Sequence, residues 1–427
     1  MSQAQLPLQI LIVGGGLCGL SAALALSRSG HKVTVLEARP GPAEIGAGIQ
    51  CQQNVSRIML SWGLEEQVEK LAEPAMPFVN YRYTGEKIAD IAMGGDEVKF
   101  PTWLIHRFDL QKLFLNAAIA AGAEVRFNSK VTKVEQSVPS VETNGESLSA
   151  DLILLADGIG SKTRRQILAG DIEPLIRSSA YRFIVPRETM LQSPETAALM
   201  LKPLRTAFFG PGRNVICYPI SRGRYFNVVM EREDEGGATL GVWNKPADLE
   251  TVHKDFEDFA PIVHRIVSLT ERQVVWIGRL LDFRFCQGGA VKLKVGGGMS
   301  IEDAAVLVEC LARIHDKKEI PVAVRSFERL RKERCGQVQD VSWQNSFLYN
   351  LPDGPEQEAR DRSIRAAEDK KKTKSVDIFE QRKIANGKGS AWDFLAQINR
   401  FDAIADARAR LGNDTLEIVG SGDGPHL

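Results

Sequence analysis

The chain has 427 residues, enough for two or three domains with sizeable cores, and its 54 basic and 54 acidic residues give a formal net charge of zero. This balance argues against a nucleic-acid-binding protein, because such proteins usually carry a basic excess. The six cysteines are scattered without a CxxC pair and no apolar run approaches bilayer-spanning length, so we expect a reduced cytoplasmic protein without disulfides, metal or membrane contact.

Residues 8–37 have the pattern of a βαβ unit that binds a dinucleotide. An apolar strand runs into the turn GGGLCG at residues 14–19, a helix of small residues follows to residue 29, and a second strand over residues 32–36 ends at Glu37. Gly14 permits a tight turn, Gly16 lets the backbone approach a pyrophosphate, and Gly19 lets the helix pack closely on the sheet. The helix N-terminus can bind phosphate, and Glu37 can accept hydrogen bonds from ribose hydroxyls. The unit predicts an adenine-dinucleotide site and does not distinguish FAD from NAD.

The following segments alternate between helices and strands, as expected for an α/β fold. We predict a glycine-bearing loop at residues 44–50, helices over 54–71 and 106–121, a strand pair over 78–92, and strands over 124–134 and 151–156. The last of these strands, DLILLA, is a continuous apolar run, which is typical of a buried parallel strand.

The character of the chain changes between residues 177 and 276. Helical patterns thin out there and short β-like segments alternate with turns, which predicts a sheet-rich domain inserted into the first one. From residue 301 onward the pattern is mostly helical, and the basic run at residues 370–374 is expected on a solvated helix face.

Two further motifs reveal a family resemblance. HRFDL stands at residues 106–110, and DGIGSKTR, which matches DGxxSxxR, follows the buried strand at residues 157–164. Together with the βαβ unit, these motifs resemble the class A flavoprotein monooxygenases of the salicylate hydroxylase and p-hydroxybenzoate hydroxylase type. The resemblance implies an α/β fold with a Rossmann-like FAD-binding domain (residues 1–176 and 277–350), an inserted β-sheet substrate domain (177–276) and a helical C-terminal region (351–427).

The resemblance also implies FAD as the cofactor and suggests which residues bind it. Glu37 would bind the adenosine ribose, Arg107 the phosphate–ribityl part, and Gly48 would face the flavin ring. Asp157 would lie near the pyrophosphate and the NAD(P)H path, or act mainly by holding its turn, and the glycines at 296–297 would form a flavin-side loop. The expected cofactor-binding residues are therefore Gly14, Gly16, Gly19, Glu37, Gly48, Arg107, Asp157, Gly296 and Gly297.

The inserted sheet is implied to bind a small aromatic substrate, with Arg182 and Tyr218 as the catalytic residues. Arg182 lies in YRFIVP at 181–186 and Tyr218 in ICYPI at 216–220. A phenolate ring is a better nucleophile than a phenol, so Arg182 would stabilise the phenolate and Tyr218 could relay its proton. The open alternative is that Tyr218 is a core aromatic with a satisfied hydroxyl and Arg182 a sheet-face cation. A basic cluster that could aid an anionic substrate is expected at the exposed surface: Arg205, Arg213, Arg222 and Arg224.

The family's third flavin motif, GDAAHP, is absent from this chain. It normally precedes the helix IEDAAVLVECLARI, which is present at residues 301–314, but residues 283–295 read FRFCQGGAVKLKV. The missing aspartate would bind the ribityl chain, so its loss should weaken FAD binding. A faulty gene model across these codons, which we favour, and a genuine loss are the two explanations that stay open.

These observations predict an FAD-dependent monooxygenase that hydroxylates an aromatic or phenolic substrate, salicylate-like or polyketide-type, with NAD(P)H and O₂. We expect a monomer or homodimer with a role in secondary metabolism or aromatic catabolism. One alternative is a degenerate, catalytically impaired member of the family that acts as no enzyme. A further alternative is an NAD-dependent dehydrogenase built on the same βαβ unit.

Overall fold

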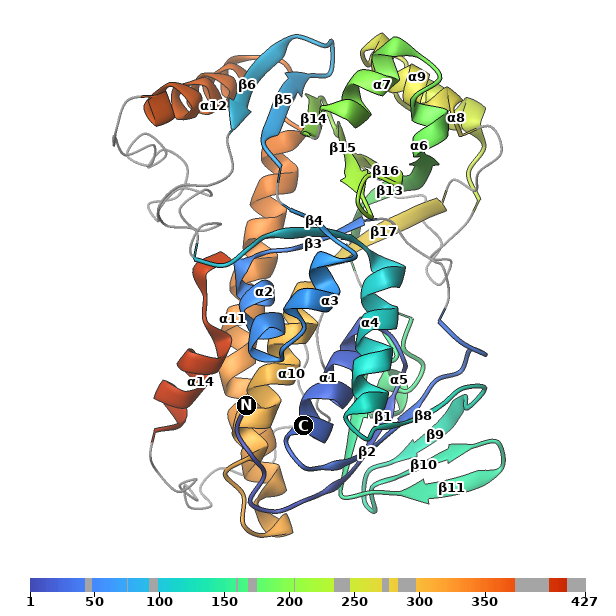
Figure 1. Ribbon diagram of the computed structural model, residues 1–427, viewed down its shortest axis with the longest axis vertical. Helices are drawn as coiled ribbons and strands as arrows, with labels where there is room; N and C mark the ends of the chain where they lie inside the picture. The colour runs from blue at the N-terminus through green and yellow to red at the C-terminus, as the bar shows by residue number, and fades with distance from the viewer. Residues whose placement is uncertain are drawn as a thin grey trace.

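The N-terminal part of the protein folds around a parallel sheet with the strand order β12-β1-β2-β8 (Figure 1). The computed structural model describes residues 1–42, 48–74, 76–91, 99–158, 160–167, 175–202, 204–233, 246–270, 276–282, 297–372 and 399–412. The strands of this sheet are β1 (Gln9–Val13), β2 (Lys32–Leu36), β8 (Glu124–Arg126) and β12 (Leu152–Leu155). All three strand pairings are parallel, as predicted for the βαβ unit and for DLILLA.

Helices cover one face of the parallel sheet and an antiparallel meander covers the other (Figure 1). The helices are α1 (Leu17–Arg28), α4 (Arg107–Ala120) and α10 (Gly297–Leu311). The meander consists of β9 (Val131–Glu135), β10 (Ser140–Thr143) and β11 (Glu146–Ser149). Ala22, Ala23 and Ala25 of α1 are fully buried, and these small side chains let α1 pack closely between its neighbours. The helix ends at Gly30, whose φ of +98° suits a residue without a side chain.

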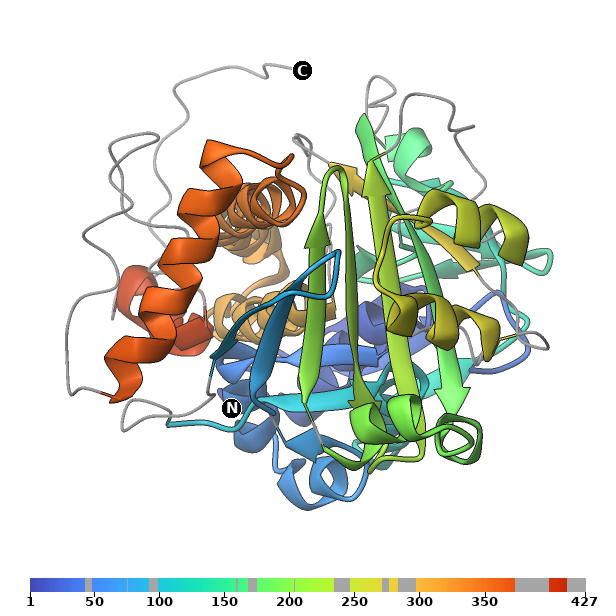
Figure 2. The same cartoon turned by 90° about the horizontal axis from the view of Figure 1, so that it is seen from above.

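A second, larger sheet forms the other half of the molecule (Figure 2). Among the residues described, its strand order is β17-β13-β16-β15-β14-β5-β6. These strands are β5 (Phe78–Arg82), β6 (Lys87–Ile91), β13 (Leu175–Pro186), β14 (Arg205–Gly210), β15 (Arg213–Ile220), β16 (Tyr225–Glu233) and β17 (Trp276–Asp282). Four short helices accompany the sheet, namely α6 (Arg187–Met190), α7 (Pro194–Leu201), α8 (Leu249–Asp255) and α9 (Pro261–Ser268).

A small three-stranded sheet connects the two halves (Figure 1). Its order is β3-β7-β4, with β3 (Gly48–Cys51), β4 (Glu73–Pro74) and β7 (Trp103–His106). Leu104 of β7 packs with Met76, Tyr218 and Ile220 in one buried cluster, so this small sheet faces the inner side of the large sheet. The space between β3 and the large sheet is therefore where residues of both halves meet.

The C-terminal part is helical, as expected. After the short 3₁₀ turn η1 (Lys317–Glu319) come α11 (Ile320–Tyr349), α12 (Pro355–Lys372) and α14 (Ala403–Leu411). Helix α11 runs from the lower half to the large sheet, and α12 packs beside the edge strand β6 (Figures 1 and 2). Within the part of the chain that the structure covers, no helix is long and apolar enough to cross a membrane.

Two sequence expectations about single elements were wrong. The helix expected over residues 54–71 is two helices, α2 (Gln53–Ser61) and α3 (Glu65–Glu69), separated at Gly63 with a φ of +64°. The strand expected over 124–134 is β8 followed by β9 in a different sheet, and the chain turns at Asn128, whose φ is +53°. In both cases one residue with a left-handed backbone conformation redirects the chain between the two elements.

The expected inserted sheet is not built from residues 177–276 alone. The hairpin β5–β6 joins it from earlier in the chain, because β5 pairs in parallel with β14. Strand β17 continues to residue 282 and pairs with β13. The sequence pattern could not show these pairings, because they join segments far apart in the chain. The domain boundaries at residues 176, 276 and 350 stay predictions.

Candidate active site

The glycine-rich turn joins β1 to α1 and leaves the N-terminus of α1 open. Gly14 has a φ of +107°, and a Cβ on this residue would lie 2.5 Å from the carbonyl oxygen of Ala156. A Cβ on Gly19 would lie 1.9 Å from the carbonyl oxygen of Gly14. Gly16 caps α1 without a side-chain hydrogen bond, and a Cβ there would meet no described atom within 4 Å. The helix-end N–H groups and the space beside Gly16 fit a phosphate group.

Glu37 follows β2 and lies beside this turn. Its carboxylate accepts hydrogen bonds from the backbone N–H of Gly15 at 2.6 Å and of Arg39 at 2.8 Å. The side chain is half-buried, so both oxygens are held in place while lone pairs remain to accept from sugar hydroxyls. This geometry fits the predicted ribose contact, which stays a prediction.

The loop that carries Asp157 touches the glycine turn. A Cβ on Gly14 would lie 3.0 Å from the Cα atom of Asp157. The Oδ2 atom of Asp157 accepts from the hydroxyl of Thr163 at 2.8 Å, and Ser161 Oγ accepts from the N–H of Arg164 at 3.0 Å. The DG motif therefore closes its own loop, with Asp157 holding the turn beside the predicted dinucleotide site.

Helix α4 brings two further side chains to this region. Gln111 Nε2 donates to the carbonyl oxygen of Gly15 at 2.8 Å, a contact that the sequence analysis missed because a helical glutamine carries no distinctive signal. At the start of the helix, desolvation and the nearby charges of Arg182 and Arg39 lower the pKa of Arg107, which remains a cation. Neighbouring guanidinium groups of this kind fit an anionic cofactor.

Strand β3 connects the cofactor side to the large sheet. The N–H of Gly48 donates to Asn227 Oδ1 at 2.6 Å, and a Cβ on Gly48 would lie 3.0 Å from a ring carbon of Tyr218. Gly297 begins α10, where a Cβ would lie 2.5 Å from a side-chain carbon of β3. Gly297 and Tyr218 therefore both lie against β3, the strand that begins at Gly48. Gly296 lies outside the described residues.

Arg182 and Tyr218 lie on the same face of the large sheet, the face turned toward β3. Arg182 of β13 and Ile216 of β15 both stand opposite Val229 of β16, and Tyr218 follows Ile216 by two residues. Tyr218 is buried, with 4% of its surface exposed. The Nε atom of Arg182 is buried and has no hydrogen-bond partner within the described ranges. An unpaired buried donor is costly unless a ligand satisfies it.

The electrostatics of this pair follow from burial. Burial raises the pKa of Tyr218 to about 12, against the opposing effects of Arg182, a hydrogen bond with Gln50 and the charge of Arg205. Burial also lowers the pKa of Arg182, and Tyr218 and Glu231 partly offset this effect. Tyr218 is therefore a neutral phenol near pH 7 that can donate a hydrogen bond, beside an arginine that stays charged.

The sequence analysis missed Arg205 and Gln50 as parts of this site. Arg205 is 6% exposed, so its expected place at the surface was wrong: it lies at the start of β14, against Gln50 of β3 and the segment at Met76. Its Nη1 donates to Gln50 Oε1 at 3.1 Å and its Nε to the carbonyl oxygen of Met76 at 3.2 Å. The run of buried neighbours in β14 was the available signal. The other members of the expected basic cluster point elsewhere, and Arg222 and Arg224 are exposed.

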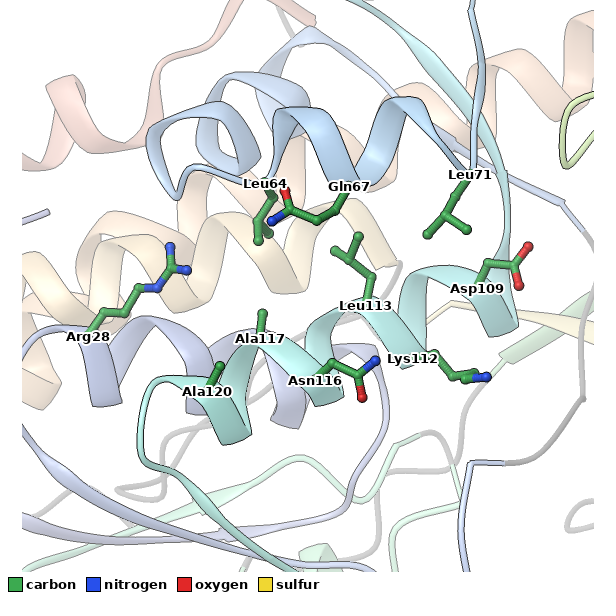
Figure 3. Close-up of a pocket in the computed structure, with 10 residues that line it drawn as sticks. All are labelled: Arg28, Leu64, Gln67, Leu71, Asp109, Lys112, Leu113, Asn116, Ala117 and Ala120. Carbon is green, nitrogen blue, oxygen red and sulfur yellow. The ribbon is translucent and has the colours of Figure 1, made fainter.

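A separate pocket of about 490 Å³ opens between α3 and α4 (Figure 3). Leu64, Leu71 and Leu113 line it, with Asp109 and Lys112 toward one end (Figure 3). None of the residues predicted to bind cofactor or substrate lines this pocket. The candidate active site is instead the region between the glycine turn, β3 and the inner face of the large sheet.

Comparison with known proteins agrees with this fold and site. A family model described as an FAD binding domain matches residues 7–180. The FAD-dependent monooxygenase OpS4 of Beauveria bassiana is 30% identical over 390 residues, which cover 85% of this chain and 90% of that protein. The 3-hydroxybenzoate 6-hydroxylase 1 of Aquipseudomonas alcaligenes is 30% identical over 372 residues, with coverages of 81% and 90%.

Solved structures show the same fold. The structure of CtdE with FAD and a substrate superposes with a TM-score of 0.75 at 19% identity, covering 94% of this chain and 97% of CtdE. A salicylate hydroxylase substrate complex gives a TM-score of 0.72 at 19% identity, with the same coverages. The fold is thus that of FAD-binding flavoproteins of the salicylate hydroxylase type. The chain belongs to the FAD-dependent monooxygenase family, and its cofactor is FAD.

The described residues fit the adenosine and pyrophosphate parts of FAD, through the open N-terminus of α1, Glu37 and the guanidinium groups near α4. Residues 283–296, where the GDAAHP motif is absent from the sequence, lie outside the described ranges. The two explanations of that absence therefore stay open. Sequencing the transcript across codons 283–295 would distinguish them.

Proposed function

We propose that this FAD-dependent monooxygenase hydroxylates a phenolic ring of the salicylate or polyketide type, with NAD(P)H as reductant and O₂ as oxidant. The proposal rests on one observation: Arg182, whose buried Nε has no partner among the residues that the structure describes, shares a sheet face with the neutral phenol of Tyr218. One relative agrees with it, since that protein is a 3-hydroxybenzoate 6-hydroxylase. Bound FAD supplies the redox chemistry that activates oxygen.

The chain's own residues would make the ring reactive. A phenolate ring is more nucleophilic than a phenol, so a group that stabilises the phenolate favours attack on electrophilic oxygen. The guanidinium of Arg182 would stabilise the phenolate oxygen, and the hydroxyl of Tyr218 would donate a hydrogen bond to it and relay the substrate's proton. The bond from Arg205 to Gln50 would keep Gln50 in position beside Tyr218.

The remaining predicted residues would hold the cofactor. Gly14, Gly16 and Gly19 would shape the pyrophosphate site, and Glu37 would bind the adenosine ribose. The residues that would bind the rest of FAD are Gly48, Arg107, Asp157, Gly296 and Gly297. A monomeric or homodimeric state and a cytoplasmic location stay predictions.

Substitution of Tyr218 tests the proposal. We expect Tyr218→Phe to lower kcat with phenolic substrates by about 100-fold, the lower end of the usual range for a proton-transfer group. FAD content should stay at the wild-type level, because Tyr218 belongs to the substrate sheet. The measurements are NAD(P)H oxidation, product formation and flavin absorbance of the purified holoenzyme.

Tyr181→Phe is the matched control. Tyr181 precedes Arg182 on β13, faces the opposite side of the sheet, and its hydroxyl donates to Asp255. This variant should keep kcat within about twofold of wild type. Equal losses in both variants would contradict a catalytic role for Tyr218, and purified protein without flavin would favour the degenerate alternative.

A further inference from the structure

Asn227 is a buried polar residue at the centre of the inner sheet face, and no step proposed above uses it. It lies on β16 with 0% of its surface exposed. Strand pairing places it directly opposite Tyr218 of β15 on one side and Ile184 of β13 on the other. Antiparallel partners on one face have Cβ atoms roughly 5 Å apart, so Asn227 and Tyr218 are immediate neighbours.

The orientation of the Asn227 amide follows from one hydrogen bond. The backbone N–H of Gly48 lies 2.6 Å from Oδ1, and a backbone N–H can only donate, so the amide oxygen must face Gly48. The Nδ2 group therefore points away from Gly48. Nδ2 is buried and has no partner among the residues described.

The Nε atom of Arg182 is also buried and without a partner among the described residues, so two such donors lie on this sheet face. An unsatisfied buried donor destabilises the folded state, so the presence of two on one sheet face calls for a physical explanation. Both groups donate and neither accepts, and Tyr218 lies on β15, the strand that pairs with β16 on the side away from β13. A ligand that satisfies them must present acceptor oxygens.

We propose that Nδ2 of Asn227 is a specificity-determining donor that binds a second oxygen of the substrate. This inference rests on the proposed function, in which Arg182 and Tyr218 bind the reacting phenolic oxygen. Because Asn227 and Tyr218 are adjacent, the second oxygen lies on the same edge of the substrate as the first. The substrate class is therefore an aromatic ring whose phenolic oxygen has a neighbouring carboxylate, carbonyl or hydroxyl oxygen.

Binding of matched aromatic probes to the holoenzyme tests this assignment. The probes are 2-hydroxybenzoate against phenol, and 1-hydroxy-2-naphthoate against 1-naphthol, each pair differing by the neighbouring carboxylate. Perturbation of the flavin absorbance gives Kd without turnover. In the wild type we expect the carboxylate-bearing member of a pair to bind at least tenfold more tightly.

Two variants of Asn227 should remove this preference. Asn227→Asp keeps an acceptor for the N–H of Gly48 and replaces the free donor by a carboxylate oxygen, and Asn227→Leu removes both groups. We expect the ratio of the two Kd values to fall below threefold in each, with FAD retained. Two variants are used because a buried carboxylate can impair folding, which melting temperature and flavin content will reveal.

Asn80→Leu is the matched control. Asn80 is also buried, and its Nδ2 also lacks a partner in the part described, but it lies on β5, farther along the sheet than β14. Its substitution should leave the Kd ratio unchanged. The inference would be overturned if the wild type bound aromatics without preferring the second oxygen, or if the Asn227 variants kept the preference. Neither result would contradict the proposed function. Failure of every aromatic to perturb the flavin would overturn the proposed function together with the inference.

Discussion

His31 shows how burial of one side chain makes the stability of this protein depend on pH. It lies just before β2, where its Nδ1 accepts a hydrogen bond from the N–H of Leu8 at 3.1 Å. Burial lowers the pKa of His31 to about 4, because the charged ring would lose its solvation. The native state therefore holds His31 neutral, while the unfolded chain protonates it below its ordinary pKa of about 6.5.

We expect the folded state to lose stability through His31 as the pH falls from 6.5 toward 4. The contribution is fully present above the unfolded pKa and amounts to a loss of about 2 kcal/mol between pH 7 and pH 5. His31→Asn keeps an acceptor for Leu8 without a titrating group, so its stability should fall less over this range. Urea unfolding at pH 7 and pH 5 measures the difference, and equal losses in both proteins would contradict the assignment.

The start of α1 combines two glycines with opposite surroundings. A Cβ on Gly19 would meet backbone at 1.9 Å, whereas a Cβ on Gly16 would meet open space. The first glycine is therefore required by packing within the protein. Among the described residues nothing fills the space beside the second, which is the condition under which a phosphate can approach the backbone.

Alanine substitutions should separate these two roles. Gly19→Ala should lower the free energy of unfolding by about 1–3 kcal/mol or more, because backbone atoms cannot move aside. Gly16→Ala should cost about 1 kcal/mol or less, because alanine is a poorer helix N-cap than glycine, while weakening FAD binding at least tenfold, or about 1.4 kcal/mol. Melting of the FAD-free protein and FAD titration measure the two effects. Normal FAD affinity in Gly16→Ala would contradict a pyrophosphate site there.

The two halves of the molecule are joined by long helices as well as by β3. Glu302 of α10 is fully buried and lies 2.8 Å from Arg331 and 3.0 Å from Arg334, both of α11. Asn54 of α2 donates to the same carboxylate at 2.6 Å. Burial alone would raise the pKa of Glu302, but the two guanidinium groups hold it below the ordinary value. Because α11 continues to the large sheet, this cluster supports the arrangement of the whole protein.

Removal of the Glu302 charge should destabilise the protein strongly. Glu302→Gln removes the carboxylate that pairs with both buried guanidinium groups, although Arg331 keeps its ion pair with Asp303 at 2.6 Å. Loss of one partner of a buried ion pair typically costs about 3–5 kcal/mol. Lys70→Ala, which breaks the exposed ion pair with Glu66 at 2.6 Å, should cost under about 1 kcal/mol. Thermal melting of the holoenzyme compares the two variants. Similar melting temperatures would show that the cluster is not central to stability.

Much of the cofactor side was predictable from the sequence, because its signals are local. The turn at 14–19, Glu37 and the DG loop are each defined by residues close together in the chain, and the structure brings them to one place. The substrate side was only partly predictable. Arg182 and Tyr218 were found through a family resemblance, whereas Gln50 and Asn227 carry no local signal. These two residues and Arg205 come together only when β3 docks on the large sheet.

The sequence by itself determined the βαβ unit, the α/β class and the helical C-terminal part, since periodicity and turn residues act over short distances. The tertiary structure alone decided that β5, β6 and β17 complete the large sheet, because strand pairing depends on segments far apart in the chain. It also decided that Arg205 is buried and that Asn227, beside Tyr218, holds a donor without a partner in the described part of the chain. The burial and the hydrogen-bond partners of a residue depend on which segments pack against its strand. The sequence of the strand itself does not specify those segments.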